Sequence, residues 1–231
     1  MPTRLRRAAA CLAAGALALS PLGCAGDAAA PAAGASTACD PGAAATRTAS
    51  CVDAFTPGES AGWGMDEFPD ILYGEPRGGG LAAGSLDVLS LGKSGEIVLG
   101  FGGNEIVDGD GVDFLVFENA FHVNGDPEKI FKELGEVSVS EDGATWHAFP
   151  CRTDGPPYDG CAGWHPILAS PETGISAFDP AVAGGDPFDL ADLGLPRARL
   201  LRIRDLSNFG GGDNAGFDLD AVAIVNPARD E

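Results

Sequence analysis

The stretch from Ile106 to Asn119, which reads IVDGDGVDFLVFEN, constrains the fold of this 231-residue chain more than any other part of it. Its first half alternates aspartates with glycines, and its second half is an aromatic and aliphatic run closed by Glu118. Glycine lets the backbone turn tightly, and a short apolar run bounded by turn residues is typical of a buried strand. Ca²⁺ binds roughly six to eight oxygens, which clustered aspartates and turned backbone carbonyls supply. The stretch therefore predicts a hard-cation site on a β-scaffold.

Short apolar runs separated by turn residues also occur on both sides of this stretch, which predicts an all-β fold. The 34 glycines and 17 prolines favour a loop-rich β-fold over a helical one. We expect strands at residues 88–91, 96–101, 113–118, 136–140, 145–149, 197–204 and 217–225.

Two of the expected elements carry signals of their own. In residues 197–204 arginines alternate with apolar residues, and the alternation slips at Leu200, which predicts a strand with a bulge. Residues 186–193 are predicted to form the one short helix, with Asp186 as its N-cap and Gly194 as its stop. Helix capping and the helix dipole explain Asp186 and Asp189 better than metal binding does.

Carboxylates gather in two segments that are far apart in the chain. Asp218 and Asp220 share a face of the last strand, whereas Asp113 and Glu118 have opposite parity and are not expected to bind one ion together. The two acidic segments would meet at one rim of a sandwich. The predicted ligands of a structural Ca²⁺ are Asp108, Asp110, Asp113, Asp213, Asp218 and Asp220. The alternative stays open that the Asp–Gly runs are only turns, in which aspartate bonds its own backbone.

The chain is strongly acidic, with a formal net charge of −20. Such a surface repels phosphate backbones and anionic lipid headgroups, so nucleic acid is excluded as an expected partner. The charge suits cation binding and solubility.

The N-terminus predicts export. Residues 1–23 combine basic residues with an apolar run too short to span a membrane, as in a signal peptide. The residues that end at Cys24 resemble the lipobox of bacterial lipoproteins, which implies lipidation of Cys24 and membrane attachment through that lipid alone. Cleavage near Ala25, which would give a secreted protein, is the alternative. Residues 24–50 are rich in Ala, Gly and Pro and predict a flexible linker before a β-sandwich domain at residues 51–228.

Four cysteines remain after the N-terminal segment, and an even number in an exported chain predicts disulfides. Three connectivities are open, of which the local one is the simplest. It joins Cys39 to Cys51 and Cys151 to Cys161.

No catalytic residues are predicted from this sequence. His122, His147 and His165 are scattered, and no GxSxG nucleophile motif or HExxH zinc motif is present. Aromatic residues in loops can stack on sugar rings, or can instead cover a core. The candidate ligand-binding residues are Trp63, Tyr158 and Trp164.

Three phrases resemble parts of discoidin-type domains, which are galactose-binding-like β-sandwiches. They are the hairpin VSEDGATW at 139–146, the strand ARLLRI at 198–203 and the closing strand GFDLDAV at 216–222. The chain is also similar to a group of bacterial cell-surface proteins of unknown function that carry "DGxGxDFxVFEN" and "GGFDLDAV". The resemblance implies a jelly-roll sandwich, often with structural Ca²⁺ and often with glycan or surface binding by loops at one end.

These observations lead to three functional hypotheses. The first is a non-catalytic exported envelope module, a Ca²⁺-stabilised β-sandwich that binds a surface ligand such as a glycan. The second is a polysaccharide hydrolase that uses two carboxylates from residues 108–113 and 213–220. The third is a structural envelope protein whose partner is another surface protein.

Overall fold

The computed structural model describes residues 39–207 and 216–230, which form an all-β sandwich, as predicted. None of the helices in these two ranges is long and apolar enough to cross a membrane. The expected signal peptide, the lipidation candidate Cys24 and the metal candidate Asp213 lie outside the described residues.

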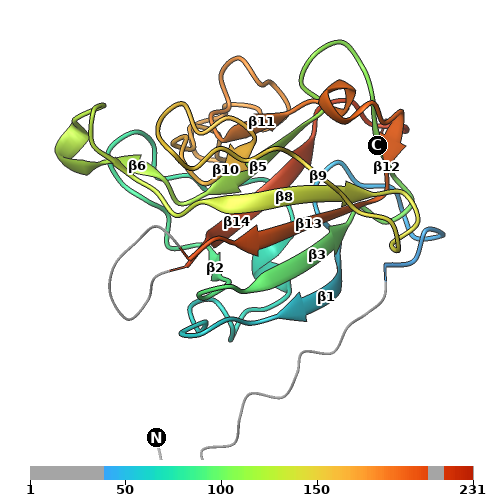
Figure 1. Cartoon of the computed structure of the whole chain (residues 1–231), viewed down its shortest axis with the longest axis horizontal. Coiled ribbons are helices and arrows are strands. Elements are labelled where there is room, and N and C mark those ends of the chain that lie inside the picture. Colours follow the sequence, from blue (N-terminus) through green and yellow to red (C-terminus); the bar gives the residue numbers. More distant parts are fainter. Residues whose placement is uncertain (1–38, 208–215, 231) are drawn as a thin grey trace, which may run out of the picture. The chain divides into compact units, whose positions relative to one another are not determined.

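One layer is a six-stranded antiparallel sheet with the order β1-β3-β13-β8-β10, in which β9 also pairs with β8 (Figure 1). Its strands are β1 (Cys51–Thr56), β3 (Glu96–Gly100), β8 (Gly135–Ser140), β9 (His147–Ala148), β10 (Cys161–Ala162) and β13 (Leu200–Asp205). The arginine-rich strand β13 lies at the centre. Its Leu201 and Ile203 are fully buried, whereas Arg204 faces outward and forms a salt bridge of 3.0 Å with Glu136.

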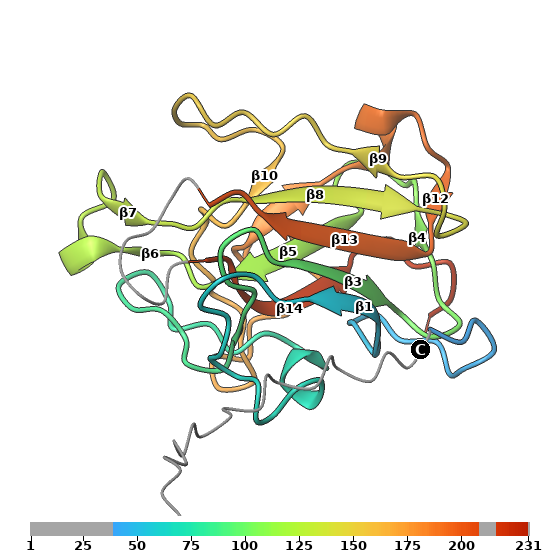
Figure 2. The same ribbon diagram turned by 60° about the horizontal axis from the view of Figure 1, so that its bottom comes forward.

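The other layer is a four-stranded antiparallel sheet with the order β11-β5-β14-β2, which lies behind the first (Figure 2). Its strands are β2 (Leu89–Ser90), β5 (Phe114–Glu118), β11 (Asp186–Phe188) and β14 (Asp218–Ile224). The main core lies between the two layers, where residues such as Leu99 and Ile203 meet Phe114 and Val222.

The sheet that contains β5 is covered on both faces. Leu115 and Phe117, which alternate with the core-facing residues of β5, pack against a second cluster that includes Ile167 and Ala183. Burial on both faces explains why Phe114–Glu118 is an unbroken apolar run rather than an alternating one.

Smaller elements complete the structure. Two short pairs are β4 (Ile106–Val107) with β12 (Arg197–Ala198), and β6 (Phe121–His122) with β7 (Ile130–Phe131). Within residues 39–207 and 216–230 the helical segments are all 3₁₀ turns, namely η1 (Asp70–Leu72), η2 (Val123–Gly125) and η3 (Leu190–Leu193).

The predicted helix at 186–193 is wrong in its first half. Residues 186–188 form the edge strand β11, and only Leu190–Leu193 are helical, with Asp189 rather than Asp186 as the N-cap. Gly194 ends the turn in the left-handed conformation, as expected. Residues 186–188 form a strand rather than a helix because Phe188 stacks on Phe114 of the neighbouring strand, and because an edge strand tolerates proline.

The predicted bulge near Leu200 is instead a change of sheet. The chain leaves β12, which pairs with β4, at Arg199 and then enters β13, which pairs with β3 and β8. The slip in alternation therefore marks the point at which the strand crosses between pairing partners.

Residues 39–50, which fall within the expected linker, pack against the sandwich as a strap. The N–H of Thr46 donates to the carbonyl of Phe101, and the N–H of Ala49 donates to the carbonyl of Val222 in the other sheet. The Cys39–Cys51 disulfide closes the strap onto β1, and the second disulfide joins Cys151 to Cys161. The local connectivity is thus the one that the structure contains.

Candidate functional site

Three carboxylates form an acidic triad at one end of β5. Oxygen atoms of Asp108, Asp113 and Asp189 all lie within 4.8 Å of one another, which is close enough to hold a metal ion. Asp108 belongs to the glycine-rich turn, Asp113 directly precedes β5, and Asp189 begins η3. The structure therefore brings together two of the predicted ligands and adds Asp189, for which the sequence favoured helix capping over metal binding.

The members of the triad differ in how far they are already hydrogen-bonded. Asp113 is fully buried and accepts hydrogen bonds from Gly109 N and Asn226 Nδ2 on one oxygen and from Leu190 N on the other. Asp189 accepts one bond from Ala191 N, as the cap of η3. Asp108 is exposed. Asp113 therefore holds three chain segments together whether or not an ion is present.

The other predicted metal ligands are placed apart from this triad. Asp110 is exposed in the same turn but is not a member of the triad. Asp220 accepts two hydrogen bonds from the backbone N–H of Arg77, and burial raises its pKa to about 7. Asp218 lies at the opposite end of β5 from the triad, beside Glu118.

At that opposite end, four side chains present buried oxygens that make no well-formed hydrogen bond. The atoms are Ser90 Oγ, both carboxylate oxygens of Glu118, Asn119 Oδ1 and Asp218 Oδ1. Ser90 is directly opposite Asp218 across the β2–β14 pair, and Glu118 is opposite the adjacent Leu219 across the β5–β14 pair. These four residues are called the orphan-oxygen cluster below. Buried polar atoms without partners are rare in folded proteins, so this cluster needs an explanation.

The electrostatics of the cluster are dominated by burial and by like charge. Burial, followed by the charges of Asp218 and Glu133, raises the pKa of Glu118 well above its usual range. Burial raises the pKa of Asp218 to about 6, although the Ser90 and Asn119 side chains, which lie near enough for weak hydrogen bonding, act to lower it. Burial also raises the pKa of Glu133 to about 7, against the hydrogen bond that it accepts from Gly216 N. Every charged group that acts on Glu118 is another carboxylate.

A small hollow of about 160 Å³ opens beside three residues of this cluster. Ser90, Asn119 and Asp218 line its polar side, and Trp63 and Leu86 line its apolar side. Trp63 is half exposed, and its indole nitrogen donates a 2.9 Å hydrogen bond to the carbonyl of Leu86, which fixes the ring at the mouth. A Cβ at Gly84 would collide with the Asn119 side chain, so glycine at this position leaves the space that the amide occupies.

The two other predicted ligand-binding aromatics lie elsewhere. Tyr158 is 8% exposed and packs edge-on against Trp164, with ring centroids 5.7 Å apart. Trp164 in turn lies against His165, with ring centroids 3.7 Å apart. Of the three predicted aromatic residues, only Trp63 lines the hollow.

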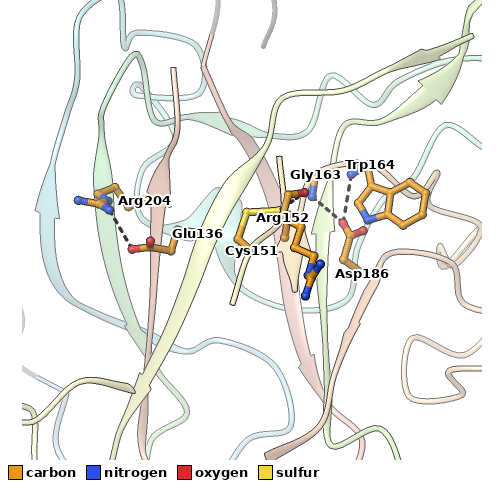
Figure 3. Close-up of a disulfide and its surroundings, with 8 residues drawn as sticks. Glu136, Cys151, Arg152, Gly163, Trp164, Asp186 and Arg204 are labelled. Carbon is orange, nitrogen blue, oxygen red and sulfur yellow. Dashed lines mark hydrogen bonds and ion pairs between the residues drawn. A yellow bond between two sulfur atoms is a disulfide. The ribbon is translucent and has the colours of Figure 1, made fainter. Parts of the chain in front are cut away.

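A buried carboxylate near this aromatic group has its partners in place. Asp186 accepts hydrogen bonds from the backbone N–H groups of Gly163 and Trp164 (Figure 3), and His165 Nδ1 lies 2.8 Å from its other oxygen. Burial raises its pKa, and these hydrogen bonds oppose that effect. Asp186 therefore connects β11 to the segment that follows Cys161 through these hydrogen bonds.

Several residues in and around the orphan-oxygen cluster are not predicted as site residues from the sequence. Ser90 and Glu133 carry no local signal, because only strand pairing and a long connection bring them to this end of the molecule. Glu118 and Asn119 do carry one, since a carboxylate and an amide that close an apolar strand are unusual there. The parity argument compares Glu118 only with Asp113, from which the length of β5 separates it.

Comparison of the chain with protein-family models, curated proteins and solved structures finds no match.

Proposed function

We propose that the protein is an exported, non-catalytic cell-envelope module, a Ca²⁺-stabilised β-sandwich that binds a glycan on a surface. The proposed sandwich type is the galactose-binding-like jelly roll that the sequence resembles. Two disulfides support export, since such bonds persist in oxidising compartments. Attachment through a lipid on Cys24 is the form of localisation that the N-terminal sequence predicts.

The observation that carries the binding role is the hollow at Trp63. It combines a fixed, half-exposed indole with the hydroxyl, amide and carboxylate groups of Ser90, Asn119 and Asp218. A sugar presents an apolar face to an aromatic ring and hydroxyls to polar groups. The volume of about 160 Å³ is below the roughly 300–1,000 Å³ of pockets that enclose a whole small molecule. The hollow would therefore hold one unit of a longer glycan.

The proposed binding role is tested with a panel of immobilised glycans and polysaccharides. Trp63→Ala is expected to abolish the binding that the wild type shows, because it removes the ring but no core contact. Leu81→Ala is the matched control, since Leu81 is similarly exposed, at 53% against 50% for Trp63, and lies outside the hollow. Equal glycan binding by wild type and Trp63→Ala would remove this site. Retention of a protein by the wild type alone would indicate a surface protein instead of a glycan.

The proposed structural Ca²⁺ is assigned to the acidic triad. An ion there would neutralise carboxylates that otherwise repel one another, and would tie the turn at 108–113 to η3. The melting temperature is expected to rise when Ca²⁺ is added to the chelator-treated protein. The variant Asp108→Asn/Asp189→Asn is expected to lose part of that rise, because it removes two ligands and leaves the buried Asp113 in place. An identical rise in this variant would show that the triad holds no Ca²⁺.

One observation favours the carboxylate hydrolase as a second candidate. Asp218 lines a hollow and has a raised pKa, as catalytic acids often do. Two of the other carboxylates considered for that role, Asp113 and Asp220, are occupied by backbone N–H groups, which argues against them as acid or base. The same glycan panel tests this candidate. Turnover that Asp218→Asn abolishes would replace the binding proposal with a hydrolase.

A further inference from the structure

We propose that the orphan-oxygen cluster of Ser90, Glu118, Asn119 and Asp218 is a second divalent-cation site, separate from the acidic triad, and that it takes Ca²⁺. This inference depends neither on an ion in the triad nor on a glycan in the hollow.

The first support is the absence of hydrogen-bond partners. Five side-chain oxygens from these four residues are buried and make no well-formed hydrogen bond, including both oxygens of Glu118, which is 0% exposed. Other buried carboxylates in the described residues show the contrast. Asp113 accepts three hydrogen bonds, and Asp205 accepts bonds from Ser94 N, Ser207 N and Phe217 N. The orphan oxygens are therefore a property of this place and not of buried carboxylates in general.

The second support is that protonation does not remove the problem. A protonated Glu118 would lose its charge and add a single O–H donor, which can satisfy only one neighbouring oxygen. The five buried oxygens of the cluster outnumber that donor. A bound cation satisfies all of these oxygens at once, because each of them is an electron-pair donor.

The third support is the type of donor. All five atoms are hard oxygens from carboxylate, amide and hydroxyl groups, which suit Ca²⁺. No cysteine or histidine is among them, so the set does not suit Zn²⁺. Ca²⁺ accepts roughly six to eight ligands in flexible geometry, which leaves positions for water entering from the hollow. Mg²⁺ requires a more regular octahedron and releases its water reluctantly.

The fourth support is the charge of the surroundings. Glu133, at 2% exposure, and the two carboxylates of the cluster repel one another, and no cationic group acts on Glu118. A divalent cation would compensate this buried negative charge where the described residues offer no lysine or arginine to do so. Strand pairing sets Asp218 opposite Ser90, and the charge of Asp218 is the largest of those that act on Glu118 at the end of the neighbouring strand.

Calcium titration by isothermal calorimetry of the chelator-treated protein tests the inference. The wild type is expected to bind two Ca²⁺ ions, and Glu118→Gln and Asp218→Asn are expected to bind one. Glu136→Gln is the matched control, because it removes a strand carboxylate that pairs with Arg204 on the surface, and it is expected to bind two. Asp108→Asn/Asp189→Asn is expected to keep the ion of the orphan-oxygen cluster.

Terbium luminescence locates the ion independently of stoichiometry. Tb³⁺ replaces Ca²⁺ at oxygen sites and emits when a nearby indole is excited. Trp63 lines the same hollow as Asp218, so sensitised emission is expected in the wild type and is expected to fall strongly in Trp63→Phe. Added Ca²⁺ should suppress the emission of the wild type by competition.

The outcomes separate this site from the triad. One Ca²⁺ that Asp218→Asn removes and Asp108→Asn/Asp189→Asn keeps would support this site and contradict the triad. Unchanged binding in both Glu118→Gln and Asp218→Asn would overturn the inference, as would a wild type that binds no Ca²⁺. Loss of folding in either variant is detected by its melting curve without Ca²⁺. In the absence of Ca²⁺, Glu118→Gln is expected to be at least as stable as the wild type, because the substitution removes a buried ionisable group.

Discussion

The carboxylate of Asp186 accepts a 2.6 Å hydrogen bond from the backbone N–H of Gly163 (Figure 3). Asp186 opens β11 at the edge of one sheet, and Gly163 follows β10 at the edge of the other. The bond therefore links the two layers at their edges, beside the Cys151–Cys161 disulfide.

Asp186→Ala is expected to lower the free energy of unfolding by ~2–4 kcal/mol. The change leaves the N–H groups of Gly163 and Trp164 without their acceptor, and an unsatisfied buried donor costs about 1–3 kcal/mol. Urea unfolding measures the effect. The exposed Asp154→Ala serves as control and should stay within about 0.5 kcal/mol of the wild type. A loss below that size in Asp186→Ala would mean that water replaces the carboxylate.

Asp113 and Asp108 should behave differently although both belong to the acidic triad. Asp113→Ala is expected to destabilise the protein by ~2–4 kcal/mol even without Ca²⁺, because three buried hydrogen bonds are lost. Asp108→Ala is expected to have little effect without Ca²⁺, since Asp108 is exposed. Melting curves with and without chelator distinguish the two. Equal effects of the two substitutions in chelator would contradict this division of roles.

The calcium-free protein is expected to become less stable as pH rises from about 4 to about 7. The folded protein raises the pKa of Glu133 to about 7 and that of Asp218 to about 6, above their ordinary values of 4.5 and 3.8. A group with a raised folded pKa contributes stability that is complete below its unfolded pKa and is lost as pH passes the folded pKa. Melting temperatures of the apo protein at pH 5, 6, 7 and 8 test this expectation.

Glu133→Gln should reduce the slope of that pH profile, because the amide cannot ionise yet can still accept the bond from Gly216 N. Asp218 and Asp220 should keep the remaining slope, since burial raises their pKa values too. Glu136→Gln, which changes a carboxylate that is ion-paired with Arg204, should leave the profile unchanged. Apo stability that stays constant or rises between pH 5 and pH 8 would contradict the raised pKa values of Glu133 and Asp218 in the folded chain.

Gly100→Ala is expected to destabilise the protein by ~1–3 kcal/mol through overpacking. A Cβ at this position would lie 2.6 Å from Cys39 Sγ and 2.8 Å from Cys51 Sγ, so the glycine makes room for the disulfide. In a Cys39→Ala/Cys51→Ala background the same change should cost less, because both sulfur atoms are gone. Urea unfolding of the four proteins gives the coupling. If the Gly100 and cysteine substitutions have additive effects on the free energy of unfolding, the overpacking does not involve the sulfur atoms.

The layers of the fold were largely predictable from sequence. Local patterns were enough for the strand at Phe114–Glu118, where burial on both faces gives an apolar run, and for the hairpin that precedes Trp146. They were not enough at residues 186–188. Capping signals there describe a helix, but the stacking of Phe188 on Phe114, 74 positions away in the chain, makes a strand.

The candidate sites were predictable only in part, for a related reason. Aspartates mark the turn at 108–113, yet Asp189 joins it only because η3 folds back beside that turn. Glu118 and Asp218 are 100 positions apart in the chain, and only the β5–β14 pairing shows that they are neighbours. Sequence pattern identifies residues that are suited to a site, whereas register decides which of them meet.

The strap at residues 39–50 has a mechanical consequence. Its backbone bonds to Phe101 beside one sheet and to Val222 in the other, and the Cys39–Cys51 bond turns it into a closed loop. A pull applied on the N-terminal side of Cys39 would therefore enter β1 directly through sulfur and would not peel the strap away residue by residue. As long as that bond is intact, the load bypasses the strap, and the backbone hydrogen bonds that join the strap to both layers stay in place.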